Sequence, residues 1–167
     1  MQDIRPVIWA DGKIRLLDQT TLPLEETEVV CEDVDTLVDA IQRLVVRGAP
    51  ALGVVGGYGV ALAITQGHKE GWDEPQLHQQ ILRVRNARPT AVNLAWGVDQ
   101  VIDSVSEGLE RVLGLAHKLA AEDEQANRKL SEHGADWILR VTGKSKLRVL
   151  THCNTGSLAT STWGTAL

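Results

Sequence analysis

Short alternating stretches of apolar and polar residues open the chain. Residues 7–17 form two such stretches on either side of Asp11-Gly12, a dipeptide that strongly favours a tight hairpin turn. Residues 27–31 have the composition of a further strand. The beginning of the sequence therefore predicts a small antiparallel sheet.

Helical spacing replaces this alternation further along the chain. Apolar residues recur three and four positions apart between Asp35 and Val45, which predicts an amphipathic helix. Asp33 or Asp35 is placed to cap its start, and Gly48 is placed just beyond its end.

Four more helical stretches follow, at residues 49–66, 74–86, 91–112 and 122–141. Pro50 suits the first turn of the second helix, where the missing N–H costs no hydrogen bond. The 49–66 stretch is slightly short for a membrane span and is diluted by four glycines, so we expect it to be a buried helix. Residues 1–143 are thus predicted to be one mostly helical domain with a small sheet.

The pattern changes again after Gly143. Residues 146–152 have the composition of a buried strand, and a helix rich in small residues is predicted to follow. Such a succession starts a parallel α/β unit. The fold class expected is α/β: the helical domain, and then residues 144–167 as the start of a Rossmann-like domain whose parallel partners are absent.

Charge and cysteine content narrow the function classes. A net charge of -5 gives no general attraction for nucleic acid or anionic membrane, so neither is an expected partner. Two cysteines are too few for a disulfide framework, and no secretory signal follows the first residue. We expect a cytoplasmic protein in which individual basic residues capture any anionic ligand.

One candidate anion site is Arg47-Gly48-Ala49-Pro50, between two predicted helices. Free backbone N–H groups and the dipole at the start of the second helix would attract a phosphate, assisted by the Arg47 guanidinium. The alternative is a tight helix–helix turn in which Arg47 only favours the end of the preceding helix. The glycine spacing fits neither a Walker loop nor a dinucleotide-binding fingerprint.

A second basic residue, Arg88, also precedes a predicted helix, and could add a contact to the same phosphate. An arginine before a proline is otherwise usually a surface residue. Cys153 lies at the end of the predicted 146–152 strand, where open α/β sheets place ligands. It is either a site residue of altered proton affinity or a small buried apolar residue. Cys31 is expected to be structural, and no zinc-binding spacing is present.

Several segments together resemble methylthioribose-1-phosphate isomerase, in that family's order and over essentially the whole chain. They are residues 9–12 (WADG), 17–19 (LDQ), 46–53 (VRGAPALG), 88–94 (RPTAVNL) and 150–156 (LTHCNTG).

The resemblance implies an aldose–ketose isomerase that converts 5-methylthioribose 1-phosphate into 5-methylthioribulose 1-phosphate in methionine salvage, without metal or organic cofactor. It implies that Arg47, Gly48, Ala49 and Arg88 bind the sugar phosphate. It also implies that Cys153 is catalytic, through stabilisation of the transition state.

The family's acid/base is an aspartate far downstream, in a second domain that also mediates its homodimer. This chain alone is therefore expected to be inactive, and its oligomeric state is left open. Two relatives give alternative functions: ribose-1,5-bisphosphate isomerase, and the non-catalytic regulatory subunits of the exchange factor of translation initiation. A truncated product that only folds and associates is a third possibility.

Overall fold

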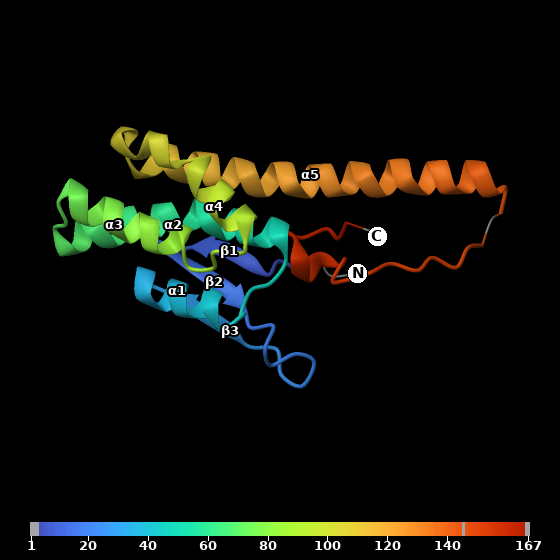
Figure 1. Ribbon diagram of the computed structural model, residues 1–167, viewed down its shortest axis with the longest axis horizontal. Coiled ribbons are helices and arrows are strands. Elements are labelled where there is room, and N and C mark those ends of the chain that lie inside the picture. The colour runs from blue at the N-terminus through green and yellow to red at the C-terminus, as the bar shows by residue number, and fades with distance from the viewer. Residues whose placement is uncertain (1–3, 145, 166–167) are drawn as a thin grey trace.

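A computed structural model describes residues 4–144 and 146–165 (Figure 1). Its elements in chain order are β1 (Val7–Ala10), β2 (Lys13–Leu17), β3 (Glu28–Cys31), α1 (Val34–Gln42), α2 (Ala49–Glu70), α3 (Glu74–Arg85), α4 (Val92–Asp99), the 3₁₀ helix η1 (Ile102–Glu107), α5 (Leu109–Thr142) and the 3₁₀ helix η2 (Ser157–Ala159). The prediction of a mostly helical domain with a small sheet is confirmed.

The three strands form an antiparallel sheet in the order β1-β2-β3. The register pairs Ala10 with Lys13 across the turn, where Asp11 and Gly12 have φ values of 53° and 75°. Such positive φ values at both central residues define the turn type whose twist matches that of a hairpin. The sheet packs against α1 and α2 (Figure 1), and Trp9 of β1 stacks on Tyr58 in the middle of α2.

Helix α2 is the centre of the core. Its residues from Ala51 to Ile64 are all buried, and α4 and α5 pack along it. A Cβ at Gly56 would overlap the carbonyl oxygen of Leu94 in α4, and one at Gly59 would lie 2.7 Å from Cγ1 of Val84 in α3. The glycines of α2 therefore allow neighbouring helices to approach closely.

Helix α2 is also long and apolar enough to cross a membrane, alone among the helices of the described residues. However, 78% of its most apolar window is buried inside the fold. This is the burial expected of a core helix, in agreement with the sequence-based prediction.

Several predicted helix boundaries are wrong. Asp33 caps α1 as expected, since its side chain accepts a hydrogen bond from the backbone N–H of Thr36, but the helix ends at Gln42 and not near Gly48. The single helix predicted over residues 91–112 is divided into α4, η1 and the start of α5, and the helix predicted over residues 122–141 is the later part of the same α5. Gly108 separates η1 from α5, because its φ of 96° does not fit an α-helix.

The strand predicted over residues 146–152 is not formed, and only η2 appears where a helix was predicted to follow. Leu150 is 98% exposed. A strand needs a hydrogen-bonded neighbour, and none lies beside this segment in the described part of the chain. Residues 146–156 instead run in extended form back from the end of α5 towards α2 (Figure 1), so the Rossmann-like start is not seen.

Candidate functional site

The connection between α1 and α2 forms the centre of the candidate site. Leu44 and Gly48 both have positive φ values, of 67° and 98°, which turn the chain sharply into α2. Arg47 is exposed, and its Nη2 donates a hydrogen bond of 2.6 Å to the backbone oxygen of Gln19. One guanidinium N–H thus anchors the side chain, while arginine carries five in total.

One side of this connection borders a cleft of about 780 Å³, here termed the Cys153 cleft. Its lining residues are Gln19, Leu22, Pro23, Arg47, Gly48, Ala49, Pro50, Cys153, Asn154, Thr155, Leu158, Ala159 and Thr165. Cys153 is exposed to the cleft and has a φ of 68°, a left-handed conformation that non-glycine residues rarely adopt. Such strain is found preferentially at functional sites.

The other side of the connection borders a hollow of about 430 Å³, here termed the Arg88 cleft. Its lining residues are Leu44, Arg47, Gly48, Ala49, Leu52, Arg88, Thr90, Ala91, Val92 and Asn93. Arg47, Gly48 and Ala49 line both clefts. The structure therefore brings all five predicted site residues around one connection, with Cys153 on one side and Arg88 on the other.

The arrangement suits an organic molecule that bears an anionic group. The first backbone N–H groups of α2 have no partner within the helix, and Gly48 supplies no side-chain cap. Two guanidinium groups, Arg47 and Arg88, border the same helix start. Helix dipole, backbone donors and arginine charge all favour a phosphate there.

Asp18 and Gln19, directly after β2, support this site; both belong to the 17–19 (LDQ) segment of the resemblance, although the sequence analysis gave them no role in the site. Gln19 is buried, accepts the hydrogen bond from Arg47, and donates through Nε2 to the backbone oxygen of Leu158 at 2.8 Å. Hydrogen bonds from Thr20 hold the pKa of the neighbouring Asp18 below its usual value, and the charge of Arg47 contributes in the same direction. Two polar residues directly after an apolar strand were the available sequence signal.

The two cysteines differ in environment. Cys31 is fully buried, and this burial raises the pKa of its thiol to about 12. A thiol with that pKa is inert at neutral pH, because the thiolate is the reactive form. Cys31 is thus structural, as predicted, and Cys153 is the cysteine with access to a ligand.

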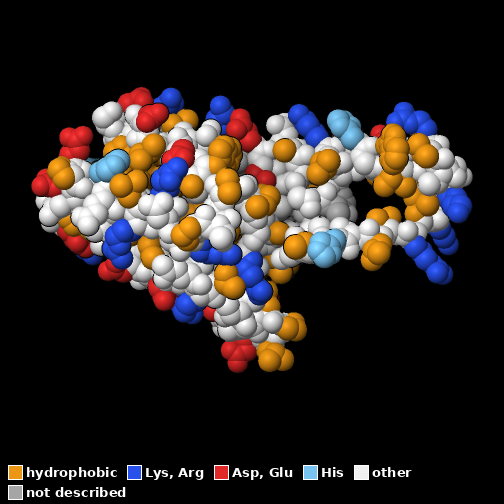
Figure 2. Space-filling model, viewed as in Figure 1, with side chains coloured by type: hydrophobic (Ala, Val, Ile, Leu, Met, Phe, Trp, Pro, Cys, Tyr) orange, Lys and Arg blue, Asp and Glu red, His pale blue; other side chains and the backbone are white. Residues whose placement is uncertain are grey.

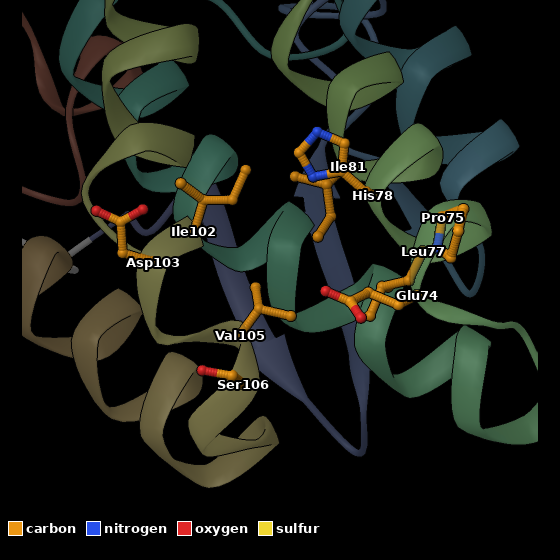
Figure 3. A pocket seen from close by; sticks show the side chains of 9 residues that line it. All are labelled: Glu74, Pro75, Leu77, His78, Ile81, Ile102, Asp103, Val105 and Ser106. Carbon is orange, nitrogen blue, oxygen red and sulfur yellow. The ribbon is translucent and has the colours of Figure 1, made fainter.

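A third cavity of about 670 Å³ lies away from these residues, between α3 and η1 (Figure 3). Leu77, Ile81, Ile102 and Val105 give it an apolar character, while Glu74 and Asp103 lie on its opposite sides (Figure 3). It contains no arginine, lysine or cysteine. This cavity therefore lacks the groups that would hold a phosphate.

A metal site is equally unsupported within the described residues, where no three His, Cys, Asp or Glu side chains cluster closely enough to bind an ion. The chemistry available at the two clefts is that of arginine, backbone N–H groups and a thiol.

The chain is similar to known proteins over most of its length. The Initiation factor 2 subunit family matches residues 45–166. A putative methylthioribose-1-phosphate isomerase of Archaeoglobus fulgidus is 43% identical over 98% of this chain and 49% of its own length.

Two solved structures are similar to the whole of the described fold. The 5-methylthioribose 1-phosphate isomerase of Pyrococcus horikoshii OT3 has a TM-score of 0.81 and 30% identity, covering 98% of this chain and 47% of the other. The translation initiation factor eIF-2B, subunit delta, from A. fulgidus has a TM-score of 0.79 and 38% identity, covering 96% and 48%.

The helical domain with its small sheet thus defines a known class of protein. The chain belongs to the Initiation factor 2 subunit family. It spans about half the length of the relatives named above.

Proposed function

We propose that this chain provides the N-terminal, phosphate-binding part of an aldose–ketose isomerase acting on 5-methylthioribose 1-phosphate. The observation that carries the proposal is the α1–α2 connection, where Arg47, Gly48 and Ala49 line the clefts of both Cys153 and Arg88. Relatives more than 40% identical over nearly the whole chain bear the name of this isomerase.

The reaction explains why such a site is useful. In a sugar 1-phosphate the ring cannot open spontaneously, because the phosphate blocks the anomeric oxygen. The C1–ring-oxygen bond must break, the hydrogen on C2 must move to C1, and the C2 hydroxyl becomes a ketone as its proton is passed to the ring oxygen. Arg47, Arg88 and the start of α2 would hold the phosphate, and Cys153 would border the reacting carbons.

The acid/base for these proton movements is proposed to be an aspartate of a downstream domain, so the 167-residue chain alone is inactive. The reaction is redox-neutral, because atoms and electrons balance within the substrate, and it consumes no external oxidant or reductant. Each proton is moved by a side chain.

A second candidate is a non-catalytic binding scaffold, which the similarity to the translation initiation factor eIF-2B, subunit delta, from A. fulgidus supports. A scaffold would have no need of an exposed, strained cysteine in a cleft that Arg47 also lines. The isomerase is preferred for that reason.

The test is an isomerase assay of this chain mixed with the downstream half of the A. fulgidus relative, with each half alone for comparison. The two halves of the A. fulgidus protein, mixed with each other, establish that halves reassemble. We expect activity only in the mixture, and we expect Cys153→Ala to abolish it while Cys31→Ala, at the buried cysteine, retains it.

Activity of the unmixed chain would contradict the proposed role of the downstream aspartate. If the mixture with this chain is inactive while the mixture of the two A. fulgidus halves is active, the scaffold is favoured. A parallel assay with ribose 1,5-bisphosphate would identify the related bisphosphate isomerase as the better description.

A further inference from the structure

Residues 157–165 are attached to the middle of α5, far from them in the sequence. The backbone N–H of Ser161 donates to Oδ2 of Asp123 at 2.7 Å. The indole Nε1 of Trp163 donates to Oγ of Ser131 at 3.0 Å, and the Arg128 guanidinium lies 4.3 Å from the centre of the Trp163 ring. One face of α5 therefore holds this segment.

The opposite side of the same segment forms a wall of the candidate site. Leu158, Ala159 and Thr165 line the Cys153 cleft. Ala159 packs against Gly48 so closely that a Cβ on Gly48 would lie 2.6 Å from the Cβ of Ala159. Loss of the attachment to α5 would therefore leave this wall of the Cys153 cleft unsupported.

We propose that Asp123 is a positioning residue of the site: through its hydrogen bond to Ser161 it holds residues 157–165 against Gly48 and so fixes the wall of the Cys153 cleft. Asp123 lines neither the Cys153 cleft nor the Arg88 cleft; it borders a separate hollow of about 300 Å³ beside Pro50 and Asn93. Its effect on the Cys153 cleft is therefore assigned to its hydrogen bond with Ser161. That the cleft serves a sugar phosphate rests on the function proposed above.

The Asp123 carboxylate is itself held in place from within α5. Nδ2 of Asn127, one turn later, donates to Oδ1 of Asp123 at 3.0 Å and to its backbone oxygen at 2.9 Å. Asn127 is buried, so this bond is shielded from water. Oδ1 is thereby occupied and Oδ2 is left directed at Ser161, which is the pre-organisation that a positioning carboxylate needs.

Few hydrogen bonds attach residues 157–165 to α5. The hydroxyl groups of Ser161 and Thr162 are buried and have no hydrogen-bond partner among the described residues. The desolvation of these two hydroxyl groups costs free energy and opposes burial of the segment. A charged acceptor for a backbone N–H is accordingly important to its attachment, since such bonds are stronger than neutral ones.

The first arm of the test measures hydrogen exchange in Asp123→Ala, with Asp136→Ala as the matched control. Asp136 is an exposed residue of the same helix with no side-chain bond among the described residues. We expect the amides of residues 159–163 to exchange about tenfold faster in Asp123→Ala only, with α2 protected as in the control. Unchanged exchange of these amides would overturn the attachment.

The second arm measures alkylation of Cys153 by iodoacetamide, with and without inorganic phosphate. Cys31 is buried and serves as an unreactive internal reference. We expect Asp123→Ala to raise the alkylation rate several-fold and to remove protection by phosphate, whereas Asp136→Ala behaves as the wild type. Asp123→Asn, which retains one oxygen, should restore much of both properties.

The outcomes separate the two proposals. Faster exchange with an unchanged Cys153 rate and unchanged phosphate protection would make Asp123 a structural residue only and would overturn its positioning role. If phosphate does not slow the alkylation of Cys153 in the wild type, the result counts against the proposed function. In that case, comparison of the alkylation rates of the wild type and Asp123→Ala without phosphate still decides whether Asp123 fixes the cleft.

Discussion

Replacement of Gly48 by alanine tests directly whether the site is built on a backbone contact. Gly48 begins α2 with a φ of 98°, and it touches Ala159 in the segment that closes the Cys153 cleft. An alanine there would meet two separate obstacles. Its backbone conformation would be strained, and its Cβ would overlap the Cα and carbonyl oxygen of Ala159.

The chain contains a control that has only the first obstacle. Gly108 begins α5 with a φ of 96°, and no atom lies within 4 Å of a Cβ built on it. Backbone strain of this kind costs about 1–3 kcal/mol, which Gly108→Ala should also show. The overlap with Ala159 adds a further 1–3 kcal/mol, typical of an overpacked contact, unless the segment detaches.

The assay combines urea unfolding with hydrogen exchange of residues 157–165. We expect Gly48→Ala either to lose about 2–6 kcal/mol of unfolding free energy or to lose less while the segment becomes unprotected. Gly108→Ala should lose only the strain and keep the segment protected. If the two variants agree in both measurements, the contact between Gly48 and Ala159 does not hold the segment and the reasoning is refuted.

Three further outcomes follow from the packing and the charges. Gly97→Ala should cost about 3 kcal/mol or more in urea unfolding, because its Cβ would overlap the backbone of Gly53 where α4 crosses α2; a cost below 1 kcal/mol would contradict this crossing. Burial raises the pKa of Cys31 to about 12 from 9.0, so the unfolded thiol ionises first as pH rises. The contribution of the Cys31 thiol to the unfolding free energy is complete below pH 9, and between pH 9 and 12 it falls by about 1.4 kcal/mol per pH unit. The unfolding free energy of a Cys31→Ala protein should therefore decline less steeply at alkaline pH. Arg88→Ala should weaken phosphate binding about tenfold by calorimetry, whereas Arg148→Ala, at an exposed arginine outside both clefts, should not; equal effects would indicate general charge attraction.

An apolar surface near the end of α5 affects how the reconstitution experiment should be carried out. Leu139, Leu147 and Val149 border an apolar opening between the end of α5 and the returning chain, and hydrophobic side chains face this opening from both sides (Figure 2). A mixture with a downstream half should be assayed at high protein concentration, because exposed apolar surface of this kind promotes association.

The sequence by itself determined the elements that depend on interactions between residues close together in the chain. The Asp11-Gly12 dipeptide set the hairpin, Asp33 set the start of α1, and Pro50 marked the first turn of α2. Each of these depends on backbone conformation or on a side chain within a few residues, so the local pattern is sufficient.

The tertiary structure decided which segments meet. Arg88 and Cys153 are 65 positions apart, and they come to the two sides of Gly48 because glycines let α2 and α4 pack closely and because α5 holds residues 157–165. It also decided that residues 146–152 form no strand, since pairing requires a neighbour in space. No local pattern contains these contacts, because they depend on packing between residues that are distant along the chain.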